Sequence, residues 1–466
     1  MKIKSMHLEN YRCFENFDID FDDQLTVLVG VNGSGKTAVL DALAVFLQIA
    51  IERSAKAPIP TLMASDARID SDKIIVLCLE IFFGQNPQES QRVFVNLNTG
   101  LLLEGKYLDC TQKMPENRRC RLKEKGGCPG QKQIKFDKFP QKFSNRSKEG
   151  IEILNPSTPL FLSAYYGAGR CLPTSQASAE QALTGRESAF KKAFDSKINF
   201  NTTLNWFDAK DAEEARARSN NPDKKDYRNP VLQAVRDAVA LALGDGDVYE
   251  FPHMDGVPPR LFVNHKTTGI AYEVNQLSDG YRTMLALVMD LARRMAVANE
   301  HVKWPEGQSA LHSPAIVLID EVELHLHPSW QQTVLPSLMK IFPQTQFIVT
   351  THSPQVLTTA RKEHIRILAD NHRDAIIPED GTYGAESSRV LAEVFSVSPR
   401  PESAASVSML HKYWELVEKG QYDSSDAKEL RAELEKDLGA DDPDLKMADM
   451  RNLQLQVLAN KNANNQ

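Results

Sequence analysis

The first part of the chain carries strand-like patterns followed by a helix-like one. Residues 2–8 and 17–21 alternate apolar with polar side chains, and residues 25–29 form a β-branched apolar run. After a short glycine-rich stretch, apolar residues recur from Val39 to Leu47 at the spacing of one helix face. These periods predict strands, then a loop at residues 30–37, then a helix.

A second α/β pattern appears in the later half of the chain. Residues 315–319 are a continuous apolar run of the kind found in buried parallel strands, and residues 346–350 form another. Between them, residues 330–341 read as one amphipathic helix. A further apolar segment, residues 158–166, ends at a Gly-rich turn. Strand, helix and strand within about 40 residues predict a βαβ unit.

The segments outside these patterns differ from them in charge and residue composition. Residues 101–150 hold 13 Lys/Arg against 6 Asp/Glu, with phenylalanines interleaved, which suits either contact with a nucleic-acid backbone or a solvated surface insert. Residues 421–450 hold 10 acids against 4 bases beside leucines at helical spacing. The predicted division is 1–83, first lobe of the core; 84–157, β-rich basic insert; 158–174, core strand; 175–245, helical insert; 246–397, remaining core; 398–466, helical oligomerisation or partner module.

Composition narrows the class of protein. The chain has 466 residues, a net charge of -7, 25% charged and 42% hydrophobic residues, which is ordinary for a globular protein and unlike a basic architectural one. No apolar run approaches the roughly 18 residues of a membrane span, and the N-terminus lacks the apolar middle of a secretory signal. We therefore expect a cytoplasmic protein that does not enter a membrane. Its six cysteines are too sparse for a disulfide scaffold, and the spacing of Cys110, Cys120 and Cys128 is not that of a zinc knuckle.

The glycine-rich stretch is the most specific motif. Gly30–Thr37 fits GxxxxGK[ST] at every fixed position, and it lies between a predicted strand and a predicted helix. Glycines let backbone N–H groups surround phosphates, and the helix N-terminus adds its dipole. Lys36 is expected to contact the β- and γ-phosphates and Thr37 to bind Mg²⁺. The motif predicts nucleotide binding.

Four polar residues follow apolar strands or precede a helix. Asp320 follows the run 315–319, where a P-loop enzyme holds its Mg²⁺, and Glu321 is placed to polarise an attacking water. His352 follows the next strand, where it would face the γ-phosphate. Ser278 precedes a long apolar helix and would offer its hydroxyl and the helix dipole to an anion.

After NYRCF, the chain carries the motifs GVNGSGKT, LSDGYR, IVLIDEVELHLHP and TTHSP in this order. This series of motifs resembles that of the ABC-type ATPases of the SMC, RecF and OLD group. The resemblance implies an α/β P-loop ABC-type ATPase head with a mixed β-sheet, which binds ATP and Mg²⁺. It implies that two subunits pair head to tail and sandwich the nucleotide. The signature departs from many members at Asp279, and no Q-loop glutamine is evident. The implied site residues are, for catalysis, Glu321, His352 and Lys36; for nucleotide binding, Arg12, Asn32, Gly33, Ser34, Gly35, Lys36, Thr37 and Ala38, with Ser278 and Gly280 in trans; and for the metal, Thr37 and Asp320.

Within that group, length and motifs point to one family. The chain lacks the long heptad arms of SMC proteins, and the 114 residues after His352 show no Toprim-like strand pattern, so we expect no nuclease in this chain. Three segments of the chain resemble sequences of the PtuA family, found in Septu antiphage systems and some retron operons: LSDGYRTMLALVMDLARR, AYYGAGR and SVSPRPES. That resemblance implies a homo-oligomer, a partner HNH nuclease of the PtuB kind, DNA reached through the complex, and, where a retron is present, its reverse transcriptase and nucleic acid.

Two other functions are compatible with the same residues. A RecF-like DNA-repair ATPase would bind DNA directly through the basic segment between Lys123 and Lys142. A nucleotide-locked assembly module would bind ATP with negligible turnover.

Overall fold

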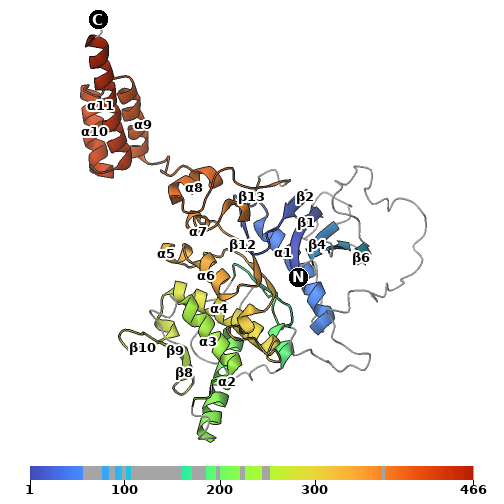
Figure 1. Ribbon diagram of the computed structural model, residues 1–466. Coiled ribbons are helices and arrows are strands. Elements are labelled where there is room, and N and C mark those ends of the chain that lie inside the picture. The colour runs from blue at the N-terminus through green and yellow to red at the C-terminus, as the bar shows by residue number, and fades with distance from the viewer. Residues whose placement is uncertain are drawn as a thin grey trace, which may run out of the picture. The chain divides into compact units, whose positions relative to one another are not determined.

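The computed structural model describes residues 1–55, 76–82, 90–96, 101–105, 159–169, 185–195, 200–220, 226–243, 252–369 and 373–464 (Figure 1). The chain divides into two compact units, residues 1–390 and residues 391–466. Each unit is described by itself. Most of the predicted basic insert, including its lysines and Cys110, Cys120 and Cys128, lies outside the described residues.

A six-stranded sheet forms the core of the first unit. Its order is β14-β13-β3-β12-β11-β7, and all neighbours are parallel except the pair formed by β14. Every residue of β3, β7, β11 and β12 is buried, which is consistent with their mostly apolar sequences. The predicted α/β fold with a mixed sheet is confirmed. The strand bounds are β3 Leu25–Val29, β7 Leu162–Tyr166, β11 Ala315–Ile319, β12 Thr345–Thr350, β13 Ile365–Leu368 and β14 Ala375–Ile376.

A second, antiparallel sheet has the order β2-β1-β4-β5-β6. Its strands are β1 Lys2–Tyr11, β2 Phe14–Asp20, β4 Val76–Phe82, β5 Ser90–Asn96 and β6 Leu101–Gly105. Apolar side chains of β1 and β2, of helix α1 (Lys36–Ala55) and of one face of the core sheet form one buried cluster. Helix α1 therefore starts at the phosphate loop and is held by both sheets.

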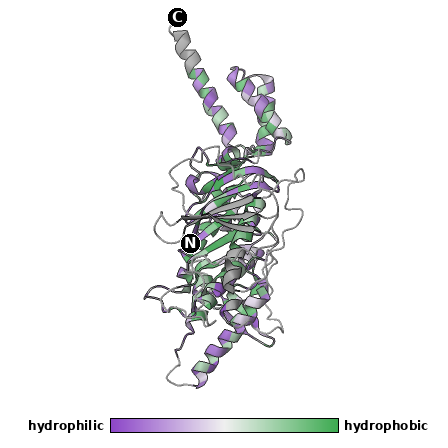
Figure 2. Ribbon diagram, turned by 90° about the vertical axis from the view of Figure 1, so that its right-hand side faces the viewer, coloured by the Kyte–Doolittle hydropathy of each residue, from purple (hydrophilic) through white to green (hydrophobic). Residues whose placement is uncertain are grey.

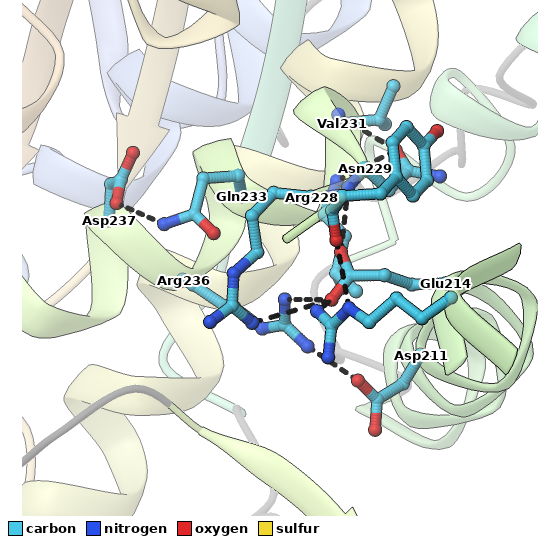
Figure 3. Close-up of polar contacts among 11 residues, drawn as sticks. Asp211, Glu214, Arg228, Asn229, Val231, Gln233, Arg236 and Asp237 are labelled. Atoms are coloured by element: carbon cyan, nitrogen blue, oxygen red, sulfur yellow. Dashed lines mark hydrogen bonds and ion pairs between the residues drawn. The ribbon is translucent and has the colours of Figure 1, made fainter. Parts of the chain in front are cut away.

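Helical segments pack beside the core sheet. They are α2 Phe200–Asn220, α3 Pro230–Ala242 and α4 Asp279–Ala298, with a small sheet of β8 His253–Asp255, β9 Arg260–Asn264 and β10 Ala271–Glu273 and the short turns η3 Arg186–Ala189, η5 Val274–Gln276 and η6 Ala310–His312. Figure 3 shows polar contacts that join α2 to α3 and its N-terminal cap: buried Glu214 accepts from Arg236 at 3.0 Å and from the Asn229 N–H at 2.6 Å. Burial alone would raise the pKa of Glu214, but these donors hold it below its ordinary value.

The predicted helix at residues 330–341 is wrong as a single element. The structure has α5 Pro328–Gln331 and α6 Val334–Ile341, with a turn between them. Pro336 explains the break, because its ring would clash with the carbonyl of Gln332 in a continuous helix and it has no N–H to donate there. At the third position of α6 the same proline is tolerated, since the first-turn N–H groups have no partner in the helix. The remaining short elements are α7 Pro354–Leu357, η7 Lys362–His364 and α8 Ser387–Phe395.

The second unit is built from three helices, α9 Ala405–Glu418, α10 Ser425–Leu438 and α11 Pro443–Asn464. Its small core contains four residues that lie at helical spacing in the sequence: Leu410, Tyr413, Val417 and Leu434. Arg431 of α10 joins α11 through Asp449 at 2.9 Å. The predicted helical character of this region is therefore present in the structure.

The longest described helices, α1, α2, α4 and α11, all carry charged residues along their length. Figure 2 shows the apolar residues of unit 1 concentrated on the core strands, with polar residues along α2. Among the residues that the structure describes, no helix has both the length and the apolar character needed to cross a bilayer.

Gln346 generates a stability prediction, because its fully buried side chain joins the two sheets. It accepts from the Ile3 N–H at 2.8 Å and donates to the Ile3 and Asp22 carbonyls at 2.8 and 2.7 Å. Gln346→Leu would leave these backbone groups unpaired, so we expect the free energy of unfolding to fall by about 2–4 kcal/mol in urea titrations. The exposed neighbour Gln344 is the control, and Gln344→Leu should change stability by less than about 0.5 kcal/mol. Equal effects of the two variants would contradict this bridge.

Candidate nucleotide-binding site

The loop between β3 and α1 has the backbone geometry of a phosphate cradle. Gly33 and Gly35 have φ of 85° and 98°, in the region that favours glycine. A Cβ at Gly35 would overlap the Phe14 ring and lie 2.8 Å from Cys13 Sγ, whereas a Cβ at Gly33 would meet no atom of the described chain within 4 Å. The loop therefore packs tightly on its Gly35 side, while Gly33 faces open space.

Lys36 folds back over this loop. Its Nζ donates to the carbonyls of Gly30 and Val31, both at 2.9 Å. Burial lowers the pKa of the Lys36 ammonium, and the nearby Asp320 and Glu321 carboxylates partly oppose that shift. A buried ammonium at the start of α1, next to the glycine-rich loop, suits a polyphosphate.

Asp320, directly after β11, is joined by hydrogen bonds to the start of α1 and to the end of β12. Thr37, in the first turn of α1, donates from Oγ1 to an Asp320 carboxylate oxygen at 3.0 Å. Thr350, the last residue of β12, donates to the other at 2.6 Å and also accepts from the Glu321 N–H at 2.8 Å. A hydroxyl and a carboxylate are hard oxygen ligands, and Mg²⁺ commonly takes one or two carboxylates together with phosphate oxygens. These residues fit Mg²⁺ bound with a nucleotide.

Glu321 is held in an unusual backbone conformation. Its φ is 49°, a left-handed value that costs of the order of 1 kcal/mol or more for a residue with a Cβ. Glu321 directly follows Asp320, whose carboxylate fits Mg²⁺. The Glu321 N–H donates to the Thr350 hydroxyl, which holds the backbone in place. The chain is thus locked at the position where the sequence predicts a general base.

His352 lies at the carboxyl end of β12, the strand between β3 and β11. It therefore follows a strand that neighbours both the phosphate-loop strand and the Asp320 strand. His352 is exposed, and its backbone N–H donates to Glu323 Oε1 at 2.6 Å.

Ser278 and Gly280 begin helix α4. Ser278 is the residue before the helix, and no hydrogen bond from the described helix N–H groups uses its exposed hydroxyl. A Cβ at Gly280 would be 3.2 Å from the His325 carbonyl oxygen, so this glycine allows α4 to approach the loop after β11. The neighbouring Tyr281 packs edge-on against Trp330, with ring centroids 4.5 Å apart. The start of α4 is thus fixed against the Asp320 loop of the same chain.

Arg12 lies beside α1, with a φ of 47°. Its Nη1 donates to Asp41 Oδ2 at 2.5 Å. A contact from Arg12 to a phosphate would compete with this ion pair.

Sequence reasoning missed Thr350 and Glu323. Thr350 is the polar residue that directly follows the apolar run 347–349, which is the available signal for it. Glu323 stands in the ELHLHP run, and its carboxylate accepts from residues that follow β12. Of the two histidines in that run, His327 caps α5 by accepting from the Ser329 N–H, while His325 is exposed with a φ of 65°.

Comparison with known proteins identifies the activity. Residues 1–229 match the family described as "AAA ATPase domain", and residues 152–358 match "AAA domain, putative AbiEii toxin, Type IV TA system". The chain is a P-loop ATPase. The predicted enzyme class is therefore confirmed, and the two matches together span the phosphate loop, Asp320, Glu321 and His352.

This ATPase is similar to proteins of two named systems. It is 28% identical to the Escherichia coli "Retron Ec83 probable ATPase" across 96% of this chain and 85% of that protein. Over a shorter stretch, 23% of this chain and 14% of the relative, it is 36% identical to "Septu protein PtuA" of Bacillus mycoides strain KBAB4. The predicted resemblance to PtuA and retron ATPases is confirmed. The SMC head domain from Thermotoga maritima aligns with 82% of this chain and all of that domain, at 15% identity and a TM-score of 0.38.

The two loop glycines of this ATPase provide a matched pair for testing the cradle. Gly33→Ala should cost about 1–2 kcal/mol of stability, because only its positive φ opposes a Cβ. Gly35→Ala should cost clearly more, since its Cβ also overlaps Phe14. Thermal unfolding of both variants measures the difference, and an equal loss would contradict the packing of Gly35 against β2.

Proposed function

We propose that this chain is the ATP-binding and ATP-hydrolysing subunit of a cytoplasmic antiphage defence complex. In it, the chain is an oligomeric scaffold whose nucleotide state regulates a partner HNH nuclease that cleaves DNA. The observation that carries the proposal is the similarity to a retron ATPase along 96% of the chain, which extends well beyond the nucleotide motifs. The local similarity to a Septu protein supports the same class of system.

The residues divide the work on ATP between binding and hydrolysis. Asn32, Gly33, Ser34, Gly35 and Ala38 offer the loop and helix N-terminus to the phosphates, and Lys36 supplies the positive charge. Thr37 and Asp320 hold Mg²⁺, which neutralises phosphate charge when bound. Glu321 orients the attacking water, and His352 contacts the γ-phosphate.

The site is completed by a second copy of the chain. Ser278 lies at an exposed helix start, and its hydroxyl is left unused by the helix. We infer that Ser278 and Gly280 contact the nucleotide held by the other subunit, so that two heads sandwich two ATP molecules. The helices of residues 398–466 then serve assembly or docking of the nuclease, and residues 84–157 form a basic insert.

Co-expression with the neighbouring genes tests the function. We expect an HNH protein to copurify with this chain and to cut DNA in a manner that depends on ATP concentration. Lys36→Ala should abolish ATP binding, whereas Glu321→Gln should keep binding and lower turnover at least a hundredfold, because it removes only the base. Both variants should lose nucleotide control of cleavage. ATP-dependent DNA binding by the chain alone, with no nuclease partner, would instead support a RecF-like repair ATPase.

The head-to-tail dimer is tested at Ser278. Ser278→Arg should leave the ATP affinity of the monomer within about twofold of wild type, but it should prevent the ATP-dependent dimer seen by mass photometry, because a bulky cation would fill the interface. Thr267→Arg, in the exposed turn between β9 and β10, is the control. If Ser278→Arg dimerises as wild type does, the nucleotide-sandwich interface is refuted.

A further inference from the structure

Glu323 makes two short hydrogen bonds to the segment that carries His352. Its Oε2 accepts from the Thr351 hydroxyl at 2.7 Å, and its Oε1 accepts from the His352 N–H at 2.6 Å. The acceptor is a carboxylate, which makes such bonds stronger than those between neutral groups. One side chain from the loop after β11 therefore clamps the loop after β12.

This clamp determines where the His352 side chain can be. Thr351 and Ser353 are buried, whereas His352 between them is exposed, so no buried packing holds the imidazole. The Ser353 N–H donates to Thr351 Oγ1 at 3.0 Å, and the Ser353 hydroxyl donates to Gln331 Oε1 at 2.6 Å. The backbone on both sides of His352 is thus fixed by polar contacts, and Glu323 provides the two that reach His352 and Thr351 from the Asp320 loop.

Glu323 itself is not placed to act as the base. Both of its carboxylate oxygens already accept hydrogen bonds from the loop after β12. Glu321, two residues earlier, directly follows Asp320 and lies in the turn that Thr350 fixes. The two acids therefore have separate tasks.

We propose that Glu323 is a positioning residue for ATP hydrolysis, which acts by holding the backbone of His352 at the γ-phosphate side of the site. This inference rests on the proposed role of His352 in hydrolysis. Glu323 would have little effect on binding, because its carboxylate accepts from Thr351 and His352, which lie outside the cradle of residues 30–37. Its loss should instead slow the chemical step, since small displacements of a reacting group can cost up to about a hundredfold in rate.

The experiment compares Glu323→Ala with Glu323→Gln in the full-length chain. Glu323→Ala should lower kcat about tenfold to a hundredfold, with KM and the Kd of the fluorescent analogue mant-ATP within about twofold of wild type. Glu323→Gln should recover most of kcat, because its amide oxygen can still accept from the His352 N–H and its NH₂ can donate to Thr351. Glu379→Ala, at an exposed acid elsewhere, is the control and should match wild type.

A double-mutant cycle tests whether Glu323 acts through His352. If it does, Glu323→Ala combined with His352→Ala should be no more than about twofold slower than His352→Ala alone. Should Glu323→Ala fail to fold, Thr351→Val and Thr351→Ser give the same comparison, with loss of kcat expected only for the valine variant.

Two outcomes would overturn the inference while the proposed function stands. One is wild-type kcat in Glu323→Ala when Lys36→Ala is inactive. The other is multiplication of the two single effects in the double variant, which would indicate independent roles. A wild-type turnover no faster than that of Lys36→Ala would overturn the proposed function, and this inference with it.

Discussion

The site depends on the two hydrogen bonds that the Asp320 carboxylate accepts. This carboxylate receives the Thr37 hydroxyl from the start of α1 and the Thr350 hydroxyl from the end of β12. These contacts exist because β12 lies between β3 and β11, so that the carboxyl ends of all three strands reach the same edge of the sheet. A slip of one residue in any of these strands would turn the end residue to the opposite face and separate the carboxylate from the phosphate loop.

A second buried network connects this edge to helix α4. The Asp320 N–H donates to the Tyr166 carbonyl at 2.8 Å, and the Tyr166 hydroxyl donates to Asp290 of α4 at 3.0 Å. Arg294 also donates to Asp290, at 2.6 Å. Burial alone would raise the pKa of Asp290, but Arg294 and Arg293 lower it, so the carboxylate stays charged. The strand that ends in Asp320 and the helix that begins after Ser278 are therefore tied together inside one subunit.

That connection gives the proposed dimer a physical basis. Gly280 lets the start of α4 approach the backbone of the loop after β11, and the same loop holds Glu321 and Glu323. A change at the nucleotide edge of one subunit would therefore bear on the surface that the subunit presents to its partner. In the proposed complex, ATP would then regulate assembly, and a separate protein would carry out the chemistry on DNA.

Local patterns in the sequence were sufficient for β1, β2, β3, β7, β11 and β12, for the phosphate loop, and for the polar residues that directly follow β11. The phosphate loop is contiguous, and strands buried on both faces are mostly apolar, so both leave a signal over a few residues. The break at Pro336 also has a local cause, although the amphipathic period concealed it. Three hydrogen-bonded pairs became apparent only in the folded chain: Thr350 with Asp320, Glu323 with His352, and Gln346 with Ile3. Each pair joins residues about 30 or more positions apart, and strand order and register, which no short pattern encodes, decide which of them meet.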